Sequence, residues 1–261
     1  AVTALVGDIS ITGTSLGGGS GLYLGRPITA LDSVLSPTSG GSITINGNTI
    51  EGALQYYGIN TVSTAPIRAW GPVVLYGQSA PVSFANWWTR AQTYGADGIN
   101  LRAPVRSHSD SVTLTGYALG NAGYGIRVVA GAPLEAAKQV TLTGIGSVGA
   151  VYVNDAITAE SDVIIDGLTT NAASSWVVRL SGATKSIWSK RGNIGITGQS
   201  GAYGLYVAMN LLAGNAATPT SGGSISLSGK SETNVGIPDG LNLDPGVSVS
   251  AWGPIIVYGQ V

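Results

Sequence analysis

One short sequence pattern returns nine times along the chain and restricts what the chain can fold into. In each copy apolar and polar residues alternate, and a glycine closes the pattern, although the third and last copies fit least well. Alternation with a period of two is typical of a β-strand with one buried face. The copies are GDISITG at 7–13, GSITING at 41–47, GPVVLYG at 71–77, DSVTLTG at 110–116, KQVTLTG at 138–144, SDVIIDG at 161–167, GNIGITG at 192–198, GSISLSG at 223–229 and GPIIVYG at 253–259.

The closing glycines lie 23 to 39 residues apart, and short apolar runs such as GLYL at 21–24 and GINL at 98–101 occur between them. One period of about 30 residues therefore holds two or three strands. We expect each closing glycine to allow a turn with positive φ. A helical chain is disfavoured, because the 40 glycines each cost about 1 kcal/mol relative to alanine in a helix interior.

Two all-β architectures remain, a sandwich or barrel and a solenoid. Only the solenoid explains why the same strand signature returns once per period instead of once per hairpin. We predict a right-handed parallel β-helix of about nine turns, each of roughly 30 residues, with equivalent residues stacked about 4.8 Å apart. The apolar pairs, such as Ile43 and Ile45, are expected to face inward. The handedness follows from the general preference for right-handed crossovers.

A second, longer repeat is also present. Residues 36–49 match 218–231 at 8 of 14 positions, and 69–78 match 251–260 at 7 of 10, both at an offset of 182 residues. Residues 36–78 thus match 218–260, and six short periods make one long one. We expect residues 1–261 to form a single β-helix segment of a longer array. Its open edges are expected to pair end to end with copies of itself or with flanking repeats.

Composition excludes several classes of function. Charged residues make up 10% of the chain, the net charge is −1, and there is one His and no Cys. This balance predicts no nucleic-acid surface, and the lack of a long apolar run predicts no membrane insertion. Thiolate and multi-histidine metal sites are excluded by residue counts. We expect no metal and no cofactor. Residues 1–8 lack signal-peptide regions, so an exported protein would be represented here by its mature form or an excised piece.

The densest acidic cluster lies at 155–166. Asp155, Asp162 and Asp166 are candidates for an acid/base pair if the protein acts on polysaccharides and their spacing is suitable. The alternative interpretation is that these carboxylates are solvated charges on the outer surface.

The basic residues suggest a weaker binding site. His108 lies in the most basic stretch, RAPVRSHSD at 102–110, which is expected to be a polar loop or else a site for an anionic glycan. Arg127 and Arg179 are expected in the turns of the β-helix just before and just after the one that carries the acidic cluster.

Aromatic residues are the main candidates for binding. Trp70 and Tyr76 recur in the long repeat as Trp252 and Tyr258, and each of these tryptophans precedes Gly-Pro at the entrance to a turn. Exposed aromatic rings stack on sugars and are enriched in interfaces. Recurrence within a repeat also fits a packing role.

A further aromatic pair, Trp87 and Trp88, lies in an insertion at 83–90 within the longest spacing. Adjacent residues of a strand point to opposite faces, so one of the two rings is expected outside the core.

The strand pattern, followed by a Gly-rich loop and G-[L/I/A]-Y-[L/V], resembles the repetitive stalks of filamentous-haemagglutinin-type exoproteins. These are secreted by the two-partner route, and related β-helices occur in autotransporter passenger domains. The resemblance covers nearly the whole chain, on motifs that many Gly-, Thr- and Val-rich β-helices share. It implies a right-handed parallel β-helix, export from a Gram-negative bacterium, and a structural or adhesive role outside the cell.

The leading hypothesis is therefore a stiff, non-catalytic stalk segment of a secreted or cell-surface filament. Its loops would contact surface glycans or host receptors, or join copies into a fibre. One alternative is a polysaccharide-active β-helix, such as a lyase, a hydrolase or a tailspike piece, although an enzyme gains little from copying its scaffold. Another is a matrix or sheath protein that polymerises through its open ends.

Overall fold

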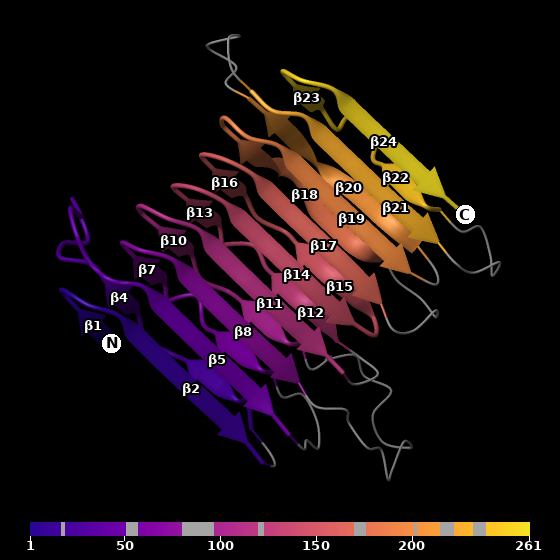
Figure 1. Cartoon of the computed structure of the whole chain (residues 1–261). Helices are drawn as coiled ribbons and strands as arrows, with labels where there is room; N and C mark the ends of the chain where they lie inside the picture. The colour runs from indigo at the N-terminus through magenta and orange to yellow at the C-terminus, as the bar shows by residue number, and fades with distance from the viewer. Residues whose placement is uncertain are drawn as a thin grey trace.

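The computed structural model describes residues 1–16, 19–50, 57–79, 97–119, 123–169, 176–200, 203–214, 222–231 and 239–261. These residues form 24 strands and no helix, which confirms the prediction of an all-β chain. The strands stack side by side from the N-terminus to the C-terminus and build an elongated solenoid (Figure 1). Three columns of parallel strands, here called faces 1, 2 and 3, surround the core.

Face 2 carries the repeated sequence pattern. It is a nine-stranded parallel sheet in sequence order, so the prediction of about nine turns is confirmed. Its strands are β2 (Ile9–Ser15), β5 (Ile43–Thr49), β8 (Val73–Ser79), β11 (Val112–Ala118), β14 (Val140–Gly146), β17 (Val163–Thr169), β19 (Ile194–Ser200), β21 (Ile225–Ser231) and β24 (Ile255–Gln260).

Faces 1 and 3 are built from shorter strands. Face 1 contains β1 (Val2–Ala4), β4 (Ile28–Ala30), β7 (Ile67–Ala69), β10 (Val105–Ser107), β13 (Leu134–Ala136), β16 (Ile157–Ala159) and β23 (Val249–Ala251). Face 3 contains β3 (Leu22–Leu24), β6 (Ile59–Thr61), β9 (Ile99–Leu101), β12 (Tyr124–Val128), β15 (Gly149–Val153) and β22 (Leu241–Leu243).

Two long strands, β18 (Trp176–Ser189) and β20 (Tyr203–Ala213), run through both faces and join them into one sheet. Their first halves lie on face 3 and their second halves on face 1. The register between β18 and β20 shifts at the bend. Ser181 pairs with Ala208 and Ser186 pairs with Asn210, so β18 advances by five residues where β20 advances by two. The extra residues of β18 form a bulge at this corner.

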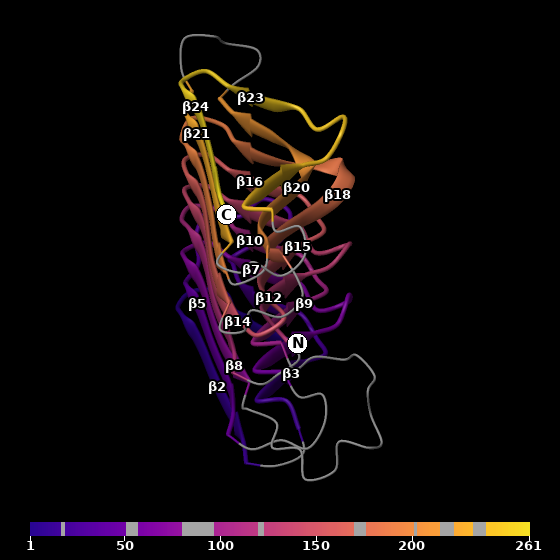
Figure 2. The same ribbon diagram turned by 90° about the vertical axis from the view of Figure 1, so that its right-hand side faces the viewer.

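The coil winds in a right-handed sense. Face 2 lies in front in Figure 1, where its strands point down to the right while successive coils climb up to the right. Figure 2 shows the same sheet edge-on at the left, with the strands of faces 1 and 3 to its right. When a right-handed coil climbs up to the right, the strands nearest the viewer run down to the right. The solenoid is therefore right-handed, as predicted.

The core is a set of aliphatic ladders along the axis. Ile43 pairs in register with Val73, which pairs with Val112, and all three are fully buried. Alternate residues such as Thr44 point outward and are partly exposed. This pattern confirms the predicted inward and outward positions. Stacked apolar rows remove a continuous surface from water, at about 25 cal/mol for each Å² buried.

The closing glycines do not make turns, which corrects the expectation of positive φ. Each lies inside a face 2 strand and points inward, and glycines with positive φ occur elsewhere, as at Gly40 and Gly131. A Cβ atom built on Gly116 would collide with the carbonyl group of Gly125 in β12, and one built on Gly47 with that of Gly58. Glycine recurs here because the backbones of faces 2 and 3 come into direct contact.

Candidate functional site

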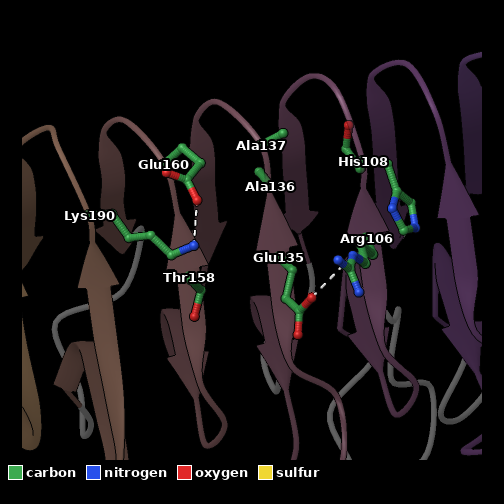
Figure 3. Close-up of a pocket in the computed structure, with 9 residues that line it drawn as sticks. Arg106, His108, Glu135, Ala136, Ala137, Thr158, Glu160 and Lys190 are labelled. Atoms are coloured by element: carbon green, nitrogen blue, oxygen red, sulfur yellow. Dashed lines mark hydrogen bonds and ion pairs between the residues drawn. The ribbon is translucent and has the colours of Figure 1, made fainter. Parts of the chain in front are cut away.

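Face 1 carries a groove on its outer side. The groove crosses β10, β13 and β16 and ends at β18 (Figure 3). It encloses about 200 Å³. Parallel pairing stacks polar residues along the groove, because Arg106 is in register with Glu135 and Glu135 with Thr158. The residues that line it are Arg106, Ser107, His108, Glu135, Ala136, Ala137, Thr158, Glu160 and Lys190.

Charges of opposite sign neutralise one another in this groove. The Nε atom of Arg106 lies 3.3 Å from a carboxylate oxygen of Glu135, and Lys190 donates to Glu160 (Figure 3). Arg191 approaches the second oxygen of Glu160 at 4.0 Å. Half-exposed ion pairs of this kind stabilise a fold by less than about 1 kcal/mol. Both carboxylates are thus engaged, and the groove offers a mixed polar surface with balanced charge.

His108 lies beside Arg106 at the right-hand end of this groove in Figure 3, opposite the end formed by Lys190. Burial lowers the pKa of His108, and the neighbouring Arg106 lowers it further. The residues before His108 correct the expectation of a polar loop at 102–110, because Val105–Ser107 form strand β10. The alternation of buried and exposed residues in β10 is too short to be recognised in the sequence. The strand forms because β10 pairs with β7 on one side and with β13 on the other.

The three aspartates of the predicted acidic site lie in different parts of one coil. Asp155 is buried between β15 and β16, Asp162 lies just before β17, and Asp166 is exposed in the middle of β17. Asp166 lies four residue-to-residue steps beyond Asp162 along extended chain, which is about 13 Å. A pair of glycosidase carboxylates lies about 5–9.5 Å apart. Asp162 and Asp166 therefore do not have the spacing of an acid/base pair.

Asp155 stabilises the corner of the solenoid. Its carboxylate accepts hydrogen bonds from the backbone N–H groups of Gly131 at 2.6 Å and Ala156 at 2.7 Å, and Lys185 lies 3.2 Å away. Burial alone raises the pKa of Asp155, but these hydrogen bonds and the Lys185 charge outweigh it and hold the pKa below 3.8. Lys185 reaches this carboxylate from the bulge of β18.

Asp162 belongs to a row of polar residues that connects successive coils between faces 1 and 2. Its Oδ1 atom accepts from the backbone N–H of Asn193 at 2.7 Å, and Asn193 accepts in turn from Ser224 at 2.9 Å. Asp8 receives the same contact from Ser42 at 2.7 Å. These side chains extend the backbone ladder beyond the starts of β2, β17 and β19.

We expect Asp162→Ala to lower the free energy of unfolding by about 1 kcal/mol, since the exposed hydrogen bonds that its carboxylate accepts from the backbone N–H and the side-chain amide of Asn193 are lost. Urea unfolding measures the change. Asp166→Ala is the matched control, because Asp166 is exposed and no hydrogen bond to it is found among the described residues. Equal losses in both variants would contradict the structural role of Asp162.

The recurring aromatic residues have equivalent positions in the two copies of the long repeat. Trp70 and Trp252 each follow a face 1 strand, and their Cβ atoms lie against Gly40 and Gly222 respectively. Trp70 is half-buried, whereas Trp252 is 58% exposed in the last coil. This contact supports the packing interpretation for Trp70.

Tyr76 and Tyr258 lie on the outer side of face 2. The hydroxyl group of Tyr76 donates to Gln78 at 3.0 Å, and that of Tyr258 donates to Gln260 at the same distance. The ring of Tyr76 also contacts Tyr117, with centroids 5.6 Å apart. These tyrosines are available at the surface but lie far apart along the axis, six strands from each other. Trp87 and Trp88 lie outside the described residues.

A second aromatic surface, on face 3, was not predicted from the sequence. Arg127 in β12 pairs in register with Tyr152 in β15, which pairs with Arg179 in β18, which pairs with Tyr206 in β20. We call these four residues the arginine–tyrosine row. Arg127 and Arg179 therefore lie within strands of the coils on either side of the acidic cluster, as expected.

Each guanidinium group of the row is held between aromatic rings. The Arg127 carbon Cζ lies 6.0 Å from the Tyr124 ring centre and 5.7 Å from that of Tyr152. For Arg179 the distances to Tyr152 and Tyr206 are 5.8 Å and 5.7 Å. Cation–π contacts of this length are favourable by about 0.5–2 kcal/mol.

Trp176 widens this surface. Its ring lies 4.9 Å from that of Tyr203 and 5.3 Å from that of Tyr206, centre to centre. All the rings are partly exposed. Face 3 thus carries a continuous aromatic strip with two embedded positive charges.

The row could have been found by aligning the middle residues of the short apolar runs. These residues are Tyr23, Asn60, Asn100, Arg127, Tyr152, Arg179, Tyr206 and Asn242. Their spacing in the sequence varies with loop length, which hides the alignment. Asn100 and Asn60 continue the row toward the N-terminus, joined by a side-chain hydrogen bond of 3.1 Å.

No protein-family model, curated protein or solved structure matches the chain. The part of the chain that the structure describes has no helix long and apolar enough to cross a membrane. Nor do the described residues contain a group of three or more side chains placed to hold a metal ion.

Proposed function

We propose that the chain is a stiff, non-catalytic stalk segment of a secreted or cell-surface filament. The observation that carries this proposal is the unbroken register of the nine strands of face 2 over the described chain. Stacked parallel strands with a dry aliphatic core resist bending, because any bend must break several backbone hydrogen bonds at once. The resemblance of the repeated strand pattern to the stalks of two-partner secreted exoproteins also supports the proposal of a stalk segment.

The long repeat supports the same function. Strands β5 and β21 hold the matching sequences and lie six strands apart in face 2. A further 182-residue unit would therefore lengthen the solenoid by six rungs without changing its cross-section. Scaffolds that grow in this way suit a filament, whereas a catalytic site gains nothing from a longer support.

The placement of the acids also favours the stalk over a polysaccharide-active enzyme. Asp155 is buried under Lys185, and Glu135 and Glu160 are held in ion pairs on face 1. An enzyme of the glycosidase type needs two carboxylates that face one substrate site. Asp155, Glu135 and Glu160 serve contacts within the scaffold instead, and among the described residues Asp166 is exposed by itself on the outer side of face 2.

Electron microscopy of the native material that contains this sequence tests the proposal. We expect a thin fibre with a rung spacing of about 4.8 Å and a longer axial repeat of about 29 Å, which is six rungs. Fibres of one long polypeptide with many 182-residue units would support a covalent stalk. Fibres that dissociate in denaturant into chains of this length would favour the sheath alternative. Isolated particles without an axial repeat would contradict the filament.

A further inference from the structure

We propose that the arginine–tyrosine row on face 3 binds an acidic polysaccharide. The guanidinium groups would pair with the acid groups of the polymer, and the aromatic rings would stack on its sugars. This inference names a ligand class for the adhesive role in the proposed function. It rests on the proposed function only where it assigns the binding site a role in adhesion. Binding itself is a property of the segment, whether or not it forms fibres.

The first argument concerns the two arginines. Their guanidinium groups are held against the aromatic rings of neighbouring tyrosines. No ion pair between either arginine and a carboxylate is found within the described residues. The Nε atoms of Arg127 and Arg179 are buried and make no hydrogen bond there. A guanidinium group fixed without a counter-ion is ready to bind a planar anion, because little side-chain entropy is lost on binding.

The acids nearest to the row do not neutralise it. Asp97 lies near Arg127, but burial raises the pKa of Asp97 to about 7, which reduces its negative charge at neutral pH. Asp244 lies at the other end of the row, hydrogen-bonded to Tyr206. Burial raises the pKa of the Tyr206 phenol, and Asp244 raises it further. The centre of the row therefore keeps its positive charge.

The second argument is the periodicity of the row. Arg127 and Arg179 are separated by two rungs, which is about 10 Å, and Tyr152 lies between them. Positive charges that recur along an axis with rings between them suit a linear polymer with an acid group at regular intervals. Trp176 and Tyr203 add a parallel line of rings for the faces of neighbouring sugars.

The charge of the chain does not favour binding of nucleic acid, another anionic polymer. Its net charge is −1 with 12 Lys and Arg in 261 residues, so the non-specific attraction that nucleic acid binding requires is weak. An acidic polysaccharide can instead combine charge with sugar stacking at one place.

Titration calorimetry with polygalacturonate, on the folded chain at low salt, tests the proposal. We expect saturable binding that weakens as salt is added, and a loss of affinity of at least about tenfold in the double variant Arg127→Gln/Arg179→Gln. The matched control is Arg26→Gln/Arg68→Gln, which removes the same charge from described positions outside both the arginine–tyrosine row and the face 1 groove. The control is expected to bind like the unmodified chain.

Two further measurements keep the result interpretable. Circular dichroism and thermal unfolding verify that each variant is folded, and Arg127→Lys/Arg179→Lys retains the charge but loses the planar fork, so intermediate affinity is expected. Tyr152→Leu is expected to weaken binding without changing the charge.

Three outcomes would overturn the proposal: no saturable binding, equal losses in the control and the Arg127→Gln/Arg179→Gln double variants, or equal affinity for polyphosphate, which would remove the role of sugar stacking. None of them would affect the fibre microscopy, so failure of this site and failure of the stalk remain distinguishable.

Discussion

Gly116→Ala is expected to lower the free energy of unfolding by about 3 kcal/mol, the upper part of the usual range for overpacking. The new Cβ atom would lie 2.6 Å from the carbonyl carbon of Gly125 and 2.8 Å from a side-chain carbon of Ile126. Neither contact can relax easily, because both groups belong to β12, which is hydrogen-bonded to its neighbours on both sides. Urea unfolding followed by circular dichroism measures the effect.

Gly195→Ala is the matched control for this substitution. Gly195 also lies inside a face 2 strand, but it points outward and nothing lies within 4 Å of its Cβ position. We expect a change within about 0.5 kcal/mol of zero. If both variants lost the same stability, the closing glycines would not be selected by the contact between faces 2 and 3.

Asp97→Asn is expected to stabilise the protein by about 4 kcal/mol at pH 8 and to change its stability little at pH 4. Burial raises the pKa of Asp97 from 3.8 to about 7, against the Tyr124 N–H and the charges of Arg127 and Arg102. Between these pH values the folded chain holds a proton that the unfolded chain releases. Stability therefore falls as the pH rises from about 4 to about 7, by about 1.4 kcal/mol for each unit of pKa difference.

Asparagine removes this penalty because it has the shape of the carboxylate and does not ionise. It also keeps the oxygen that accepts from the Tyr124 N–H at 2.9 Å. Free energies of unfolding at several pH values, compared between variant and unmodified chain, isolate Asp97 because the other acids titrate in both. Asp166→Asn on the exposed side of β17 is expected to change stability by less than about 0.5 kcal/mol at either pH. A difference between Asp97→Asn and the unmodified chain that did not grow from pH 4 to pH 8 would refute the assignment.

Most of the architecture could be predicted from the sequence, while most of the candidate site could not. The pattern around Ile43 and Ile45 indicates a strand and its buried side, and nine copies indicate nine turns. The strand at Val105–Ser107 and the tyrosines of face 3 were not recognised as parts of columns, because their runs are too short to show a period. The acidic cluster at 155–166 looked like one site, but its members point into different parts of the coil.

The glycine pattern illustrates the same division. Its recurrence in the sequence shows that glycine is required once per turn, and a turn with positive φ is the usual local reason. The reason here is the approach of another strand, as where Gly47 meets Gly58. A requirement set by a partner far along the chain leaves the same mark in the sequence as one set by the local backbone.

The sequence by itself determined the strands, their buried sides, the number of coils and the 182-residue repeat. These properties depend on alternation between neighbouring residues, which the backbone geometry of a strand converts directly into faces. Only the tertiary structure decided which side chains meet across coils, such as Arg127 with Tyr152 and Asp155 with Lys185. Loops of unequal length change the spacing along the chain but not the register of the stack, so contacts between coils are fixed by strand pairing in three dimensions.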